Sequence, residues 1–258
     1  MMQSENRKKV SLILTTYNCL DCFHKTIKTI ENQDYPNIEV CIADGASTDG
    51  TLEAIIDYAA SSKYTVVYKS EKDSGIYDGI NHAITLSTGD YLEIMNDEYT
   101  CNNAVSLLVE AIEKSDDNCV GSHADLIYQE NGKIRRYWKM GNGSLYSGWM
   151  PAHPSLILKR EVYEQYGFYN TDYICSADYE FMLRFLKDGK KVEYIPETLI
   201  SMFYGGTSTA TAGGYWVSVK EAIQALHDNK IPFALWITFL RTIRVLFQFI
   251  RGGREVRS

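Results

Sequence analysis

The stretch IEVCIADGASTDGTLEAIIDYAA, residues 38–60, decides the fold class of this chain. It opens with an almost unbroken apolar run, which is typical of a strand buried on both faces of a sheet. It closes with apolar residues at the spacing of one helix face, namely Leu52, Ile55, Ile56 and Ala59. Polar residues 47–51 supply N-cap chemistry between the two. A buried strand followed directly by an amphipathic helix is one unit of an α/β fold.

The same unit recurs on both sides of this stretch. Further strands are expected at 10–18, 65–70 and 91–96, and further helices at 20–33 and 75–87. Strand and helix therefore alternate three times before residue 96. The pattern predicts an α/β fold with a mostly parallel central sheet flanked by helices.

The second half of the chain predicts a mixed α+β arrangement that completes the same domain. Helices are expected at 102–115, 160–167 and 176–189, and strands on either side of the Asn131-Gly132 turn and at 190–196. No linker or internal repeat interrupts the pattern. We therefore expect an N-terminal extension over 1–8, one domain over 9–228 and a separate C-terminal helix and tail over 229–258.

The charge is unevenly distributed. The formal net charge of −7 excludes a general nucleic-acid-binding protein on electrostatic grounds. Residues 231–258 instead carry five Arg against one Glu. This basic tail is expected to behave as a separate physical unit.

Cysteine usage favours a reducing compartment. The six cysteines are scattered, and no signal peptide is apparent at the N-terminus, so we expect free thiols in a cytoplasmic protein. Cys19 and Cys22 form a C-x-x-C pair just after a predicted strand, which leaves a thiol oxidoreductase as one alternative function. The larger repeating α/β unit argues against it.

Polar residues follow each predicted strand of the first half. They are Thr16, Tyr17 and Asn18 after the first, Asp44 after the second, Asp73 after the third, and Asp97 and Glu98 after the fourth. In parallel α/β sheets, ligands bind beyond the carboxyl ends of the strands. These side chains are therefore expected to gather at one functional edge.

Five motifs, VSLILTTYN, IADGASTDGT, EKDSGIYDGINHAI, TGDYLEIMNDE and SADYEFMLR, occur in an order and spacing that resemble family 2 glycosyltransferases. The resemblance covers roughly residues 9–205. It implies the Rossmann-like GT-A fold and transfer of a sugar from a nucleotide-diphosphate donor to an acceptor hydroxyl. It also implies inversion at the anomeric carbon and the use of Mg²⁺ or Mn²⁺. It favours UDP, with GDP and dTDP left open.

The resemblance also assigns the donor side of the site. It implies a nucleotide pocket lined by Thr16, Tyr17 and Asn18, with Asp44 at the base or ribose. It places the remaining donor contacts at Asp73, Ser74, Gly75, Asp78, Asn81 and Asn96. Asp49 is open to reading as a helix cap.

Asp97 and Glu98 are the predicted metal ligands. A departing diphosphate needs a hard divalent cation, and Mg²⁺ typically takes one or two carboxylates. Aligned on Asn96 without a gap, the family's metal-binding Asp falls on Tyr99, which cannot ligate. We favour a one-residue shortening that brings Asp97 and Glu98 into place. The alternative is an exposed acidic turn, which would suit a partner subunit that binds a nucleotide-sugar without catalysis.

Asp178 matches the family's catalytic base. Ser176 is expected to cap its helix, which places Asp178 in the first turn, where the helix dipole alone also favours an acid. Glu180 and Arg184, four residues apart, are expected to form a helix-surface pair. His153 and Trp149 are weaker candidates for the acceptor side, and core packing is the alternative for both. Trp138 is open to the same two readings.

The tail from Ile231 to Arg251 predicts an interfacial membrane helix. Its longest uncharged run, 231–240, is too short to span a bilayer. Its basic stripe consists of Arg241, Arg244, Gln248 and Arg251, surrounded by Trp236, Phe239, Phe247 and Phe249. The alternative is a helix packed on the catalytic domain or on a second subunit. Membrane contact would place the site beside a lipid-linked acceptor at the cytoplasmic face, as in bacterial-type polysaccharide or glycoconjugate assembly.

Overall fold

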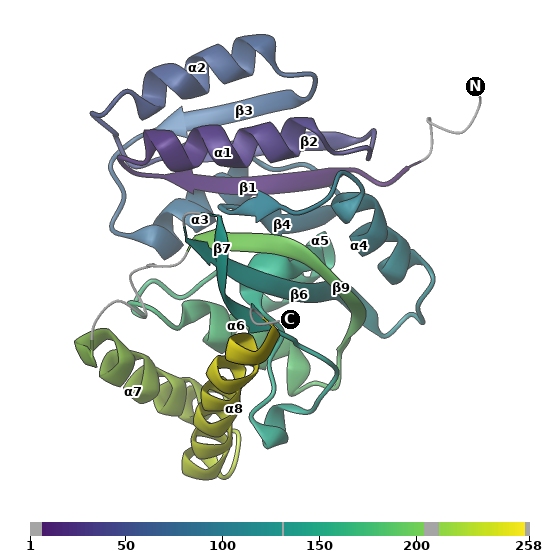
Figure 1. Ribbon diagram of the computed structural model, residues 1–258, viewed down its shortest axis with the longest axis vertical. Helices are drawn as coiled ribbons and strands as arrows, with labels where there is room; N and C mark the ends of the chain where they lie inside the picture. The colour runs from purple at the N-terminus through teal and green to yellow at the C-terminus, as the bar shows by residue number, and fades with distance from the viewer. Residues whose placement is uncertain (1–6, 131, 204–211, 256–258) are drawn as a thin grey trace.

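The structure is a computed structural model that describes residues 7–130, 132–203 and 212–255, without the side chains of 212, 213, 215 and 246–255. A nine-stranded sheet runs through the molecule in the order β3-β2-β1-β4-β8-β6-β9-β5, and β7 pairs with β6 (Figure 1). The strands are β1 (Val10–Thr16), β2 (Ile38–Asp44), β3 (Thr65–Ser70), β4 (Tyr91–Ile94), β5 (Glu98–Tyr99), β6 (Cys119–Glu130), β7 (Lys133–Trp138), β8 (Leu156–Lys159) and β9 (Lys191–Phe203).

The helices fall between these strands. They are α1 (Leu20–Glu31), α2 (Thr51–Ser61), α3 (Ile76–Leu86), α4 (Ala104–Glu113), α5 (Arg160–Tyr166), α6 (Ala177–Leu186), α7 (Ala212–Asp228) and α8 (Ala234–Glu255), with short 3₁₀ turns η1 (Leu145–Ser147) and η2 (His153–Ser155). The predicted α/β class is confirmed, because β3, β2, β1 and β4 are parallel neighbours. The predicted hairpin is also present as β6 and β7.

The sheet is mixed because β8 and β5 run antiparallel to their neighbours. Neither strand was expected from the sequence. β8 has four residues and β5 has two, and such short segments carry too few side chains to show a period. β8 joins β4 to β6, so it links the parallel first half to the second half in one sheet.

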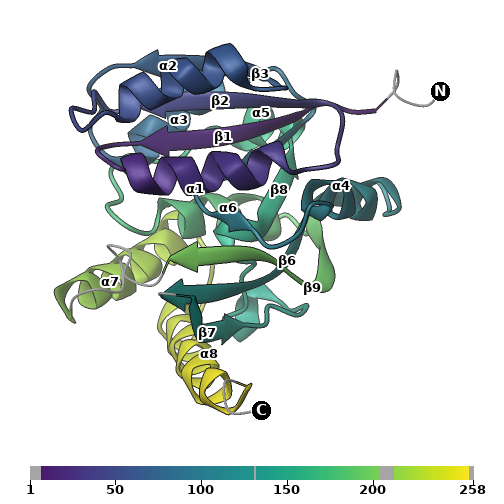
Figure 2. The same ribbon diagram turned by 45° about the horizontal axis from the view of Figure 1, so that its top comes forward.

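Helices cover both faces of the parallel strands, as Figures 1 and 2 show. Successive residues of a strand point to opposite faces. In β1, Leu12 packs into the apolar layer that contains Phe23 of α1, whereas Ile13 packs into the layer that contains Ile80 of α3 and Phe181 of α6. This two-sided burial explains why the strands are continuous apolar runs.

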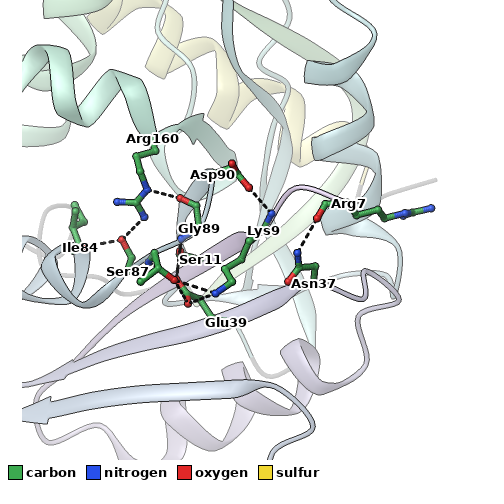
Figure 3. A network of polar contacts seen from close by, with 11 residues as sticks. Arg7, Lys9, Ser11, Asn37, Glu39, Ile84, Ser87, Gly89, Asp90 and Arg160 are labelled. Atoms are coloured by element: carbon green, nitrogen blue, oxygen red, sulfur yellow. Dashed lines mark hydrogen bonds and ion pairs between the residues drawn. The ribbon is translucent and has the colours of Figure 1, made fainter. Parts of the chain in front are cut away.

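The amino ends of the parallel strands are closed by one buried carboxylate, Glu39 on β2 (Figure 3). It accepts hydrogen bonds from the hydroxyls of Ser11 (2.6 Å) and Thr88 (2.7 Å), the amides of Thr88 (2.5 Å) and Gly89 (3.0 Å), and Nζ of Lys9 (3.1 Å). Burial alone would raise the pKa of Glu39, but these hydrogen bonds outweigh burial and lower it to about 2. The buried charge of Glu39 is therefore satisfied by hydrogen bonds within the fold.

The C-terminal helix packs against the second half of the sheet. α8 contacts β7, η1 and α7, and Ala234, Ile237 and Thr238 are buried there (Figure 2). Gly148 makes this approach possible, because a Cβ at this position would lie 2.4 Å from the backbone nitrogen of Arg241. The alternative of a packed helix is therefore realised at the start of α8. The side chains of Phe247, Gln248, Phe249 and Arg251 lie outside the described residues.

Across the described ranges, no helix is both long enough and apolar enough to cross a bilayer.

Candidate active site

Hydrogen bonds join the carboxyl ends of the parallel strands into one edge. The side chain of Asn96, after β4, accepts a bond from the Thr15 amide (2.9 Å) and donates one to the Thr15 hydroxyl (3.0 Å). The amide of Asn18, after β1, donates to Ser47 Oγ (2.9 Å), and its side chain accepts from the Thr48 amide (2.8 Å). The structure thus brings together the strand ends that the sequence predicted to meet.

Asp44 holds three segments at this edge together by hydrogen bonds. Its buried carboxylate accepts bonds from the hydroxyls of Thr16 (3.0 Å), Ser47 (2.5 Å) and Ser70 (2.6 Å). Burial raises the pKa of Asp44, but these bonds outweigh it and hold the pKa below its usual range. Because its oxygens are occupied, Asp44 positions the loops around it, and its contact with a base or ribose stays a prediction. Tyr17 beside it is an exposed aromatic side chain.

The loop before α3 brings Asp73 against two glycines. A Cβ at Gly45 would lie 2.8 Å from Asp73 Oδ2, and one at Gly79 would lie 3.1 Å from it. The missing side chains therefore let Asp73 enter between β2 and α3. Its other oxygen accepts a bond from the amide of Gly75 (3.0 Å), which holds the turn into α3.

Asp78 and Asn81 are used structurally in this conformation. Asp78 accepts bonds from the amide (2.9 Å) and hydroxyl (2.8 Å) of Ser74, which lower its pKa and cap the start of α3. Asn81 bonds the carbonyl (2.8 Å) and amide (3.0 Å) of Tyr169 with the two ends of its side-chain amide. Donor contacts for both residues stay predictions.

Asp49 acts as a cap between two loops. Its carboxylate accepts bonds from the amide of Leu20, at the start of α1, and from the amide and hydroxyl of Thr51, at the start of α2. These bonds hold its pKa below the usual range. The sequence predicted that residues 47–51 cap α2. Gly50 occupies the N-cap position and has no side chain, so Asp49 accepts the hydrogen bonds at this helix start instead.

Asp97 and Glu98 lie at the edge, and no cationic side chain among the described residues pairs with either carboxylate. Asp97 is half-buried, and none of the described residues donates a hydrogen bond or ion pair to it. Burial, and then repulsion from Glu98, raise the pKa of Asp97 to about 7. Tyr99 points the other way, into the core, where its hydroxyl donates to Glu93 (2.7 Å). Since neighbouring residues of a strand face opposite sides, Glu98 faces away from that core.

This pair fits a divalent cation. Burying a carboxylate without a partner is costly, and a bound cation would remove that cost. In the part of the chain that the structure describes, no group of three or more His, Cys, Asp or Glu side chains could hold a metal. Of the described residues, Asp97 and Glu98 would hold the cation, with diphosphate and water completing the shell, as Mg²⁺ sites often do.

Asp178 lies in the first turn of α6, where the sequence placed it, between the donor edge and a cavity. Its Oδ1 accepts a hydrogen bond from the hydroxyl of Tyr77 on α3 (3.2 Å). Tyr77 stacks on Tyr169, whose hydroxyl lies 2.8 Å from Nε2 of His153. Burial lowers the pKa of His153, although the Asp178 charge opposes the shift, so this imidazole is neutral at pH 7.

The cavity beside Asp178 measures about 510 Å³. It is lined by the β6–β7 hairpin, residues 148–154, the start of α6, and α7 and α8. His153, Trp149 and Trp138 all line it, as the acceptor-side prediction requires. Trp149 is nevertheless also packed, because it is buried and its Nε1 donates to the carbonyls of Met140 and Gly141.

Tyr128 connects the metal candidate to the base candidate. Tyr128 lines the cavity. Burial raises the pKa of its hydroxyl, the Arg136 charge opposes this shift, and the charges of Asp97 and Asp178 add smaller contributions that raise the pKa. Both carboxylates are therefore close enough to act on one side chain.

Two expectations for α6 need correction. Glu180 and Arg184 do pair, but Glu180 is buried, and Arg184 also donates to the carbonyls of Tyr166 and Phe168. The pair therefore anchors a loop and is not a surface pair. Ser176 occupies the N-cap position, but its side chain makes no capping bond and instead meets Ser218 of α7.

The C-x-x-C pair, Cys19 and Cys22, is not joined by a disulfide in this structure. All six cysteines are free thiols, and burial raises the pKa of Cys19, which disfavours the reactive thiolate. Sequence reasoning also missed Tyr77, Tyr128 and Tyr169. Tyr77 shares a helix face with Ile80 and Ile84, so its spacing indicates only core packing, and no local signal marks the other two.

Comparison with known proteins agrees with this geometry. Residues 11–184 match the family model "Glycosyl transferase family 2". An uncharacterized glycosyltransferase of Haemophilus influenzae is 26% identical over 247 residues, which cover 90% of this chain and 76% of that protein.

Two solved structures share the fold. The mannosyltransferase PcManGT from Pyrobaculum calidifontis, in complex with GDP-Man and Mn²⁺, superposes with a TM-score of 0.68 at 18% identity, over 97% of this chain and 74% of that one. S. aureus TarS 1–349, in complex with UDP-GlcNAc, gives 0.70 at 14% identity, over 92% and 72%. The predicted GT-A fold is thereby confirmed.

Proposed function

This chain belongs to glycosyl transferase family 2, and from that premise we propose that it transfers a sugar from a nucleoside diphosphate, UDP first among the candidates, to an acceptor hydroxyl with inversion. The position of Asp178 carries the proposal. It is bonded to Tyr77 of the donor-side helix and also lines the cavity that an acceptor could enter. A base between the two substrates is what an inverting displacement requires.

The donor would lie across the carboxyl ends of β1, β2 and β4. The exposed ring of Tyr17 is available to stack on a nucleobase, and the loops at Asn18 and Asp73 are held rigidly enough to shape the pocket. Asp97 and Glu98 would hold Mg²⁺ or Mn²⁺, which when bound stabilises the charge that develops on the leaving diphosphate. The complex of PcManGT with GDP-Man and Mn²⁺ supports this assignment.

The chemical step uses the carboxylate of Asp178. It accepts the proton of the acceptor hydroxyl as that oxygen bonds to the anomeric carbon. The bond from this carbon to the diphosphate oxygen breaks on the opposite face, and its electron pair leaves with the nucleoside diphosphate. The Tyr77 hydroxyl donates to Asp178 Oδ1, which orients the carboxylate and leaves the other oxygen for the acceptor.

The proposal includes peripheral contact with the cytoplasmic face of a membrane and a lipid-linked acceptor in polysaccharide or glycoconjugate assembly. Large apolar side chains at the start of α8 are more than half exposed, namely Phe233, Leu235, Trp236 and Phe239. Apolar side chains beside a basic stripe are typical of helices that lie in the membrane interface. The proposal also treats residues 229–258 as a separate C-terminal unit. In this unit, α8 would both contact the membrane and form one wall of the cavity.

The direct test is UDP release from a panel of UDP-sugars, with a bacterial membrane lipid extract as the acceptor source. Asp178→Asn should lower turnover by about 10²–10⁴-fold and leave the thermal unfolding midpoint unchanged. Glu161→Gln, an exposed carboxylate on α5, is the matched control and should retain activity. Equal turnover in wild type and Asp178→Asn would exclude Asp178 as the base. UDP-sugar binding without turnover in any condition would favour the inactive partner.

A further inference from the structure

The cavity beside Asp178 is basic although the chain as a whole is acidic. The described residues that line it include four cationic side chains, Arg136, Lys139, Arg241 and Arg244, and one carboxylate, Asp178. The formal net charge of the protein is −7. Positive charge is therefore concentrated in a concave, partly desolvated site, where it attracts anions most strongly.

Two of these cations, Arg241 and Arg244, come from α8. An aromatic ring holds Arg241, and uncharged hydrogen-bond acceptors hold Arg244. The guanidinium of Arg241 lies over the ring of Tyr179, 4.6 Å from its centre, directly beside Asp178 in sequence. Arg244 donates to the carbonyl (2.9 Å) and hydroxyl (3.2 Å) of Ser147. Within the described ranges, no carboxylate lies at ion-pair distance from either arginine. These contacts orient the two guanidinium groups and leave their charge uncompensated.

The helix that carries them is fixed to the body of the protein. Gly148 has a φ of +69°, and a Cβ there would lie 2.4 Å from the backbone nitrogen of Arg241. Ile237, one turn earlier in α8, is 1% exposed. The backbone at Arg241 therefore has a definite position relative to Asp178, as a binding residue needs.

We propose that Arg241 and Arg244 bind a phosphate or diphosphate ester of the acceptor and so present its hydroxyl to Asp178. The inference deepens the proposed function and rests on it for the identification of the acceptor. A guanidinium group matches phosphate oxygens with paired hydrogen bonds. Two guanidinium groups in one cavity match a multiply charged phosphate better than a singly charged carboxylate.

The test is calorimetric titration of the full chain with inorganic pyrophosphate in EDTA. Without divalent metal, the carboxylates of Asp97 and Glu98 repel pyrophosphate from the donor edge. Wild type should bind, and Arg241→Gln and Arg244→Gln should each weaken binding about tenfold or more. Arg135→Gln is the matched control, because Arg135 lies on β7, pairs with Glu130 and does not line the cavity. It should bind within about twofold of wild type.

Further measurements separate this inference from the proposed function. Manganese-dependent UDP binding should survive in Arg241→Gln, which shows that the variant is folded. Pyrophosphate binding in EDTA should survive in Asp97→Asn. The inference is overturned if wild type fails to bind pyrophosphate, if the double variant Arg241→Gln, Arg244→Gln binds it as wild type does, or if Asp97→Asn abolishes binding.

A second ligand identifies the source of the phosphate. Tighter binding of geranyl diphosphate than of pyrophosphate, lost in Arg241→Gln, supports the site and assigns its ligand to a lipid carrier. Equal binding of the two, again lost in Arg241→Gln, supports the site with a water-soluble phosphate ester.

Discussion

Glu39 and Asp97 are carboxylates at opposite ends of the parallel sheet, and their surroundings differ. At the amino ends of the strands, Glu39 accepts five hydrogen bonds and its pKa falls to about 2 (Figure 3). At the carboxyl ends, Asp97 accepts none from the described residues and its pKa rises to about 7. The first charge is stabilised by hydrogen bonds within the fold, whereas the second has no such donor among the described residues.

The difference separates Glu39, which stabilises the fold, from Asp97, to which we assign a role in function. A carboxylate whose charge is satisfied contributes to folding, while one left without donors opposes it. The cost at Asp97 is reasonable if a cation and a diphosphate are bound there during catalysis. Removing the charge should therefore have opposite consequences for stability at the two ends.

The largest expected effect on stability is at the closed end. Glu39→Gln should lower the free energy of unfolding at pH 7 by about 3 kcal/mol, which corresponds to the fall in its pKa from 4.5 to about 2. Urea denaturation measures this change. Glu53→Gln, an exposed acid in the first turn of α2, should change stability by less than about 0.5 kcal/mol. Similar losses in both variants would contradict the role of the Glu39 network.

The pH dependence should sharpen the same point. Because the folded pKa of Glu39 is depressed, its contribution is fully present above about pH 4.5 and is lost as the pH falls toward about 2. The stability gap between wild type and Glu39→Gln should therefore close over this window. Denaturation curves for the two proteins at several pH values test it, and a gap that stays constant down to pH 2 would contradict the assignment.

The open end should respond with the opposite sign and a smaller magnitude. Without metal, a raised pKa means that the charged form of Asp97 opposes folding, so the stability of wild type should fall as the pH rises from about 3.8 through about 7. In EDTA at pH 8, Asp97→Asn should be more stable by about 1–2 kcal/mol, reduced from the full shift because the side chain is partly solvated. A clear loss of stability instead would mean that the fold itself satisfies this charge.

A separate effect on stability is expected at Gly148, the glycine against which α8 packs. Gly148→Ala should cost about 1–3 kcal/mol, since the new Cβ meets the α8 backbone and the φ is positive. Gly132→Ala has a similar φ but open space around it, so it isolates the backbone strain. The excess loss in Gly148→Ala measures how firmly α8 is docked, and equal losses would show that the contact contributes nothing.

The sequence predicted which residues lie at the carboxyl ends of the parallel strands better than it predicted the role of each residue. Alternating strands and helices placed Thr16, Asp44 and Asp97 at strand ends, because strand period and direction are local properties. Which of these carboxylates is already satisfied depends on partners far away in the chain, such as Ser70 for Asp44. Periodicity carries no information about such partners.

The acceptor side was the least predictable part. Its cavity is built from β7, α6, α7 and α8, which are separate segments of the chain that come together only in the tertiary structure. The stripe containing Arg241 and Arg244 was visible in the sequence, but the cavity that these two arginines line was not. Their packing against Tyr179 and Ser147 is a tertiary contact that no helical spacing could reveal.

The central claim is that Asp97 and Glu98 form a cation site for the donor diphosphate. Calorimetric titration with UDP, with and without Mn²⁺, tests it most directly in wild type, Asp97→Asn, Glu98→Gln and the control Glu53→Gln. The account predicts that Mn²⁺ tightens UDP binding at least about tenfold in wild type and in the control, and that Asp97→Asn or Glu98→Gln abolishes this gain. Equal UDP affinity with and without Mn²⁺ in wild type, unchanged in both variants, would contradict it.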